Sequence, residues 1–116
     1  MKPHWIYVFG PIGGAFKVGY TSNVKTRTND LRCNAVCALR GHSFKDAEMR
    51  HLESIFGREL AKKAERLSHH ALSPHRLNDP KKDYWQQERE WFRAELPLII
   101  SVVQKAVEEV TAACPP

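Results

Sequence analysis

Glu53 is the residue whose surroundings most strongly indicate chemistry. Residues 45–68 are predicted to form a long helix, and on a helical wheel its apolar side chains gather within about 60° of Met49. These side chains are Leu52, Phe56, Leu60, Ala64 and Leu67. Glu53 lies at about 40°, inside this stripe, and a buried carboxylate is costly unless it is paired or binds a cation. Glu53 is therefore a candidate metal ligand, with a structural ion pair to an arginine as the alternative.

Basic residues near the N-terminus indicate a negatively charged partner. Residues 1–45 carry seven Lys/Arg and one acid, whereas residues 46–116 carry eleven Lys/Arg and twelve acids. Arg27 falls in the first turns of a predicted helix, where free backbone N–H groups favour an anion and a guanidinium fits phosphate. We therefore expect electrostatic binding of nucleic acid by this region. The expected binding residues are Lys25, Arg27, Arg32 and Arg40.

A predicted β-hairpin carries two further candidates, Tyr7 and Lys17. Residues 4–9 and 15–20 read as strands, and residues 10–14 between them are rich in turn residues. The expected pairs are Phe9 with Ala15, Tyr7 with Lys17 and Trp5 with Gly19 on one face, and Ile6 with Val18 and Val8 with Phe16 on the apolar face. Because side chains alternate along a strand, Tyr7 and Lys17 share a face in any even-numbered register.

The remaining elements predict one domain over residues 1–116. Thr21, Ser22 and Asn23 offer N-cap groups for a short helix at residues 24–32. The other expected elements are a third strand within 35–44 (Ala35–Leu39), the long helix at 45–68, an irregular insertion at about 69–89, order again at 90–93, and an apolar helix from Pro97 to about Ala112. The predicted fold class is α/β (α+β), with a small mixed or antiparallel three-stranded sheet and flanking helices.

In this order, the motifs resemble those of the GIY-YIG nuclease superfamily. Trp5-Ile6-Tyr7 stands where the superfamily has Gly-Ile-Tyr, and Lys17-Val18-Gly19 where it has Tyr-Ile-Gly. The run from Lys17 to Thr21 is similar to the Lys-Ile-Gly-x-Thr of the phage-type branch, and Arg27 follows at the family's spacing. Leu52-Glu53-x-x-Phe56-x-x-x-Leu60 resembles the segment with the metal-binding glutamate, and Glu90-Trp91-Phe92-Arg93 resembles a later motif of that branch.

The resemblance implies a metal-dependent endonuclease, with DNA favoured over RNA as substrate. Tyr7 would be the general base toward water, helped by Lys17 because a free tyrosine titrates near about 10. Arg27 would clamp the scissile phosphate, and Glu53 would hold one Mg²⁺ or Mn²⁺ that supports the leaving 3′ oxygen. The surrounding structural motif would be Gly19, Thr21 and Asn23.

Three features depart from the family pattern. Trp5 replaces the first glycine of Gly-Ile-Tyr, and residues 61–89 form a longer span than the branch usually has. Many members carry a histidine four residues after the arginine, where this chain has Leu31. His42 and His51 are the candidates to replace that histidine.

Three other functions stay open. The fold could bind nucleic acid without catalysis, which an exposed or arginine-paired Glu53 would favour. A small zinc-binding protein would use Cys33 and Cys37 with two histidines among His42, His51, His69, His70 and His75. A partner-docking domain would use the wide apolar surface of the C-terminal helix, which could instead form a homodimer interface or a core helix covered on two sides.

Composition argues against several other classes of protein. With 42% apolar and 27% charged residues, the chain can bury a core and disorder is not expected. No run reaches the about 18 apolar residues of a membrane span, and the N-terminus lacks the apolar segment of a signal peptide. Three loosely spaced cysteines argue against a disulfide framework. We therefore expect a cytoplasmic protein with no membrane association.

Overall fold

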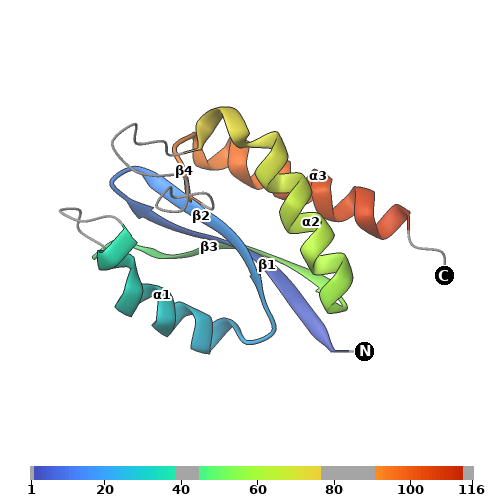
Figure 1. The fold of residues 1–116 in the computed structure, drawn as a ribbon, viewed down its shortest axis with the longest axis horizontal. Helices are drawn as coiled ribbons and strands as arrows, with labels where there is room; N and C mark the ends of the chain where they lie inside the picture. The colour runs from blue at the N-terminus through green and yellow to red at the C-terminus, as the bar shows by residue number, and fades with distance from the viewer. Residues whose placement is uncertain (1, 39–44, 77–90, 114–116) are drawn as a thin grey trace.

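The computed structural model describes residues 2–38, 45–76 and 91–113, which form an antiparallel sheet between helices (Figure 1). The elements are β1 (Pro3–Ile12), β2 (Ala15–Thr21), α1 (Val24–Ala38), β3 (Glu48–Phe56), α2 (Arg58–Ala71), the 3₁₀ turn η1 (Ser73–His75), β4 (Trp91–Phe92) and α3 (Leu96–Ala112). The sheet has four strands in the order β3-β1-β2-β4. The predicted α+β class is therefore confirmed, with one strand more than expected. No helix in the described ranges is both long and apolar enough to cross a membrane.

The predicted hairpin forms, but its register differs by two residues from the expected one. Tyr7 pairs with Gly19 and Phe9 with Lys17, because β1 continues beyond Phe9 through an irregularity before Ile12 pairs with Ala15. The turn contracts to Gly13 and Gly14, whose positive φ angles of 59° and 78° suit a two-residue hairpin turn. A shift of two preserves the faces, so Tyr7 and Lys17 still lie on the same side of the sheet.

Each face of the sheet has its own apolar cluster. On one face, Ile6, Val8, Phe16 and Val18 pack with buried residues of α2 and α3, as the expected apolar face of the hairpin requires. On the other face, Leu31 of α1 packs into a smaller cluster. That cluster contains Tyr7, Phe9, Ile12, Ala15, Leu31, Ala47 and Trp91. Helices thus cover both faces, α1 on one side and α2 with α3 on the other (Figure 1).

The long helix expected at 45–68 is wrong in its first half. Residues 48–56 form the edge strand β3, which pairs with β1, and a helix begins only at Arg58. Gly57 separates the two elements with a φ of 95°, a conformation that favours glycine. The apolar residues counted from Met49 therefore belong partly to a strand and partly to a helix. Helical-wheel angles that relate residues on the two sides of Gly57 are not valid.

Other boundaries also differ from the sequence prediction. The helix expected to end at residue 32 extends to Ala38 as α1, so the third strand predicted at Ala35–Leu39 is wrong. Residues that were assigned to an irregular insertion from 69 onward begin with the end of α2 and with η1, and residues 77–90 lie outside the described ranges. The C-terminal helix is confirmed as α3, with proline in its first turn. Its buried positions are Ile99, Val103, Ala106 and Val110, which makes it a core helix.

Candidate active site

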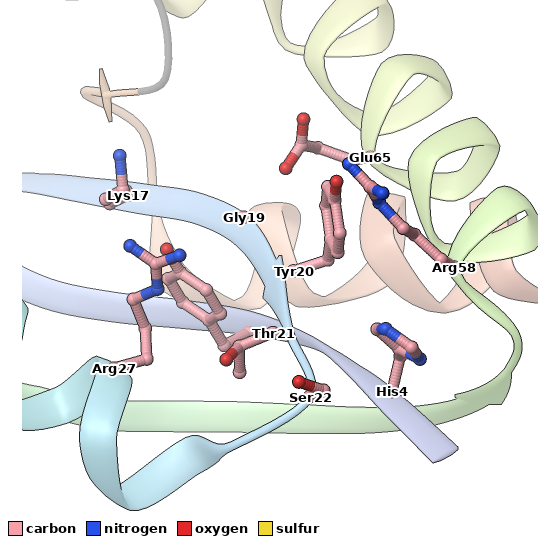
Figure 2. A pocket seen from close by; sticks show the side chains of 10 residues that line it. His4, Lys17, Gly19, Tyr20, Thr21, Ser22, Arg27, Arg58 and Glu65 are labelled. Atoms are coloured by element: carbon pink, nitrogen blue, oxygen red, sulfur yellow. The ribbon is translucent and has the colours of Figure 1, made fainter. Parts of the chain in front are cut away.

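A cavity of about 540 Å³ lies at the part of β2 that follows Lys17 (Figure 2). Its lining residues are His4, Tyr7, Lys17, Gly19, Tyr20, Thr21, Ser22, Arg27, Arg58 and Glu65. β4 pairs with Phe16 and Lys17, so within the described ranges the strand from Gly19 to Thr21 has β1 as its only sheet neighbour. Side chains from both faces of the sheet therefore reach this cavity around the edge of β2.

Tyr7 and Gly19 line the cavity on the α1 face. They are paired across β1 and β2, and a Cβ atom added to Gly19 would lie 2.6 Å from Cζ of Tyr7 and would also collide with its hydroxyl oxygen. Glycine is therefore needed at position 19 to make room for the phenol of Tyr7. Tyr7 is only 2% exposed, and Lys17 on the same face is its diagonal neighbour across the strands.

Arg27 reaches the cavity from the first turns of α1. The Asn23 side chain caps this helix, because its Oδ1 accepts a hydrogen bond from the backbone N–H of Thr26 at 3.0 Å. The Thr21 hydroxyl also accepts a hydrogen bond from the Asn23 N–H at 3.1 Å, which ties the end of β2 to the start of the helix. The predicted N-cap is thus confirmed, and it sets Arg27 beside Lys17 and Gly19 (Figure 2).

The α2 face of the cavity supplies a second set of side chains. Arg58 and Glu65 are seven residues apart on α2, so they share one side of the helix two turns apart. Figure 2 shows both extending toward the Tyr20 hydroxyl, across β2 from Arg27. One turn after Glu65, His69 Nε2 lies 2.7 Å from the Val18 carbonyl oxygen of β2, a hydrogen bond that fixes α2 against the strand. Among the described residues, Glu65 is the sole carboxylate lining the cavity.

Comparison with known proteins assigns the family of this chain. A family model described as the T5orf172 domain matches residues 4–111. The chain belongs to the T5orf172 domain family. T5orf172 domains occur in phage-type homing and nuclease-like proteins and are related to the GIY-YIG-like fold, which indicates a nuclease-like, nucleic-acid-related role. No curated protein and no solved structure matches the chain significantly.

Glu53 does not lie where the sequence placed it in this T5orf172 domain. It belongs to β3 and pairs with Ile6, so its side chain is on the face opposite Tyr7, and it is not among the residues that line the cavity. The Glu53 side chain is 27% exposed, and its Oε1 lies 2.7 Å from Nε2 of His51. The expected burial within a helical stripe is therefore wrong, and a histidine accounts for the carboxylate.

The other predicted residues divide between the cavity and the scaffold. Arg32 donates a hydrogen bond at 3.0 Å to the Ala47 carbonyl, so it ties α1 to the segment before β3 instead of lining the cavity. Lys25 is exposed on α1, also outside the lining. Arg40 and His42 lie outside the described ranges. Leu31, at the position where relatives of the superfamily carry histidine, is buried among apolar side chains.

The cavity residues that the sequence reading missed are His4, Tyr20, Arg58 and Glu65. For Arg58 and Glu65 a signal was present in the second half of the predicted helix, because two residues seven positions apart fall on one side of a helix. His4 Nδ1 lies 3.1 Å from the Lys2 carbonyl, and its ring is 6.3 Å from that of Tyr20. No group of three or more His, Cys, Asp or Glu in the described ranges is placed to hold a metal ion.

Proposed function

We propose that this T5orf172 domain is an endonuclease that hydrolyses phosphodiester bonds with the help of one divalent cation. DNA is favoured over RNA as its substrate. One observation carries the proposal. Around the edge of β2, a tyrosine and cations from one face of the sheet meet a carboxylate and an arginine from the other face. Hydrolysis of a phosphodiester needs an activated water on one side of phosphorus and support for a leaving oxygen on the other. The cavity has candidates for both.

On the α1 face, Tyr7 is the proton acceptor for the attacking water. Its ring is held by the core and its hydroxyl lies against Gly19, so the oxygen is fixed in position before substrate binds. Lys17, its diagonal neighbour, favours the phenolate by its positive charge. Arg27 neutralises the scissile phosphate with two donors in one plane.

On the α2 face, Glu65 takes the role that the sequence gave to Glu53. Mg²⁺ and Mn²⁺ are bound through one or two carboxylates together with substrate phosphate and several waters. A single carboxylate in a cationic cavity of this size fits that requirement, because the substrate supplies further oxygens. When bound, the cation would act as a Lewis acid toward the leaving 3′ oxygen.

The test is cleavage of labelled duplex, single-stranded and branched DNA and RNA, with Mg²⁺, Mn²⁺ or EDTA. We expect cleavage only with the divalent cation, and a loss of at least about 10³-fold in Glu65→Gln with fold and affinity retained. Glu59→Gln is the matched control, because Glu59 is an exposed carboxylate on the same helix and does not line the cavity. A wild-type protein that binds but never cuts would reduce the function to that of a nucleic-acid-binding module.

A further inference from the structure

Arg58 is a second guanidinium in the cavity, and the proposed reaction does not use it. It is exposed at the start of α2, on the opposite side of β2 from Arg27 (Figure 2). Within the described ranges it makes no hydrogen bond or ion pair, unlike Arg32 and Arg50, which hold backbone carbonyl groups. An arginine that has no protein partner among the described residues of a polar cavity is suited to an anion such as phosphate.

The two guanidinia lie in one cavity on opposite sides of β2 (Figure 2). Arg27 comes from α1 and Arg58 from α2, and the β2 segment from Gly19 to Thr21 lies between them in the same cavity. Resting on the function proposed above, we infer that Arg58 binds the phosphate immediately 5′ to the scissile one. The substrate strand would therefore cross the edge of β2 from one face of the sheet to the other.

The polarity follows from the geometry of the displacement. Attacking and leaving oxygens lie in line on opposite sides of phosphorus. Tyr7 places the attacking water on the α1 face, so the leaving 3′ oxygen is on the α2 face with Glu65. That oxygen belongs to the nucleotide whose own phosphate is the next one in the 5′ direction. Arg58, two helical turns from Glu65 on the same side of α2, is the cation of that helix that lines the cavity.

The test combines Arg58→Ala with substrates in which one phosphate is replaced by an uncharged methylphosphonate. On the fully charged substrate we expect kcat/KM to fall by about 10- to 100-fold, the range for a lost hydrogen bond to a charged group. In a second substrate the methylphosphonate replaces the phosphate immediately 5′ to the scissile phosphate. Here Arg58→Ala should lower kcat/KM by less than about twofold, because the charge that Arg58 would bind is already gone. In a third substrate the methylphosphonate replaces the phosphate immediately 3′ to the scissile phosphate, and the full loss of kcat/KM in Arg58→Ala should remain.

Two results would overturn the inference. One is that Arg58→Ala lowers kcat/KM on the 5′ methylphosphonate substrate as much as on the fully charged one. The other is that this fall disappears on the 3′ methylphosphonate substrate. If Arg58 only positioned Glu65, Arg58→Ala would slow all three substrates equally, which is the first of these outcomes. Arg66→Ala is the matched control, because Arg66 is an exposed arginine on the same helix that lines a different cavity, between α2 and α3. Its cleavage should match wild type on every substrate.

A binding arm separates this inference from the proposed function. Each phosphate contact steepens the dependence of log K on log salt by about 0.9 for duplex DNA or about 0.7 for a single strand. In EDTA, Arg58→Ala should flatten the slope by about that amount, and Arg66→Ala should not. If Arg58→Ala flattens the slope but the wild-type protein cuts no substrate, the nuclease function and the 5′ assignment are wrong and a phosphate contact at Arg58 remains. If Arg58→Ala leaves the slope unchanged, Arg58 does not contact phosphate.

Discussion

The two sides of the cavity differ in how the chain builds them. The α1 side is local: Tyr7, Lys17 and Arg27 come from one hairpin and the helix capped directly after it. The α2 side depends on long-range packing, because α2 follows a strand that pairs with β1, and His69 holds it to the Val18 carbonyl. The half that we propose to bind the scissile phosphate is thus set by short-range sequence, whereas the position of Glu65 depends on the fold.

Because Tyr7 is proposed to be the general base, we expect the largest loss of cleavage activity from a substitution on the α1 side. Tyr7→Phe should lower kcat by about 10²- to 10⁴-fold, the contribution of a positioned general base. Stability should hardly change, because the ring still fills the space over Gly19. Tyr20→Phe is the control at the same cavity, and a similar loss there would remove the distinction between the two hydroxyls. The measurement is single-turnover cleavage with excess protein.

Arg27 and Arg32 compare a cavity arginine with a scaffold arginine on the same helix. Arg27→Ala should lower cleavage by about 10²- to 10³-fold and flatten the salt dependence of duplex binding by about 0.9 in slope. Arg32→Ala should leave the slope unchanged and lower the free energy of unfolding by about 1–2 kcal/mol, because it loses its hydrogen bond to the Ala47 carbonyl. Equal slopes for wild type and Arg27→Ala would show that Arg27 does not touch phosphate.

Lys17 tests whether the α1 side is tuned by charge. Lys17→Met should move the rising limb of the pH–rate profile to higher pH, because the phenolate of Tyr7 loses a neighbouring positive charge. Lys17→Tyr, with the residue that the wider superfamily carries, should retain measurable cleavage. A rising limb that stays in place in Lys17→Met would assign Lys17 to phosphate binding alone.

The smallest effect is expected from the contact that positions the α2 side. His69→Ala should lower the free energy of unfolding in urea by about 1–3 kcal/mol, because the Val18 carbonyl loses its partner. Cleavage should fall only a fewfold. His70→Ala, at the exposed neighbouring position, should stay within about 0.5 kcal/mol of wild type. Equal stability of the two variants would mean that His69 does not hold α2 on the sheet.

The same contrast explains what the sequence could predict. The hairpin faces survived a register error of two residues, because the side-chain period of a strand depends only on parity. The N-cap at Asn23 is a local signal and was read correctly. The strand β3 was not predicted, because its apolar residues match a helical spacing as well as a strand. Its pairing with β1 is visible only in the fold.

Glu53 shows how a correct physical rule can rest on the wrong local structure. The rule that a buried carboxylate needs a partner holds, but it was applied to a helix that does not exist at that position. Starting the helix after Gly57 moves Glu53 to an edge strand beside His51 and brings Glu65 to the cavity. The family match extends over both residues and does not choose between them, so our proposal of Glu65 rests on its place in the cavity lining.

The most direct test of the whole account is therefore a measurement of Mn²⁺ bound to the protein–DNA complex by electron paramagnetic resonance. Wild type and Glu53→Gln should bind the ion with equal affinity, because Glu53 lies outside the cavity and pairs with His51. Glu65→Gln should weaken Mn²⁺ binding by about 10-fold or more, because a coordinating carboxylate becomes a neutral amide. If Glu53→Gln loses the ion and Glu65→Gln keeps it, the division of the cavity into an attacking side at Tyr7 and a metal side at α2 is wrong.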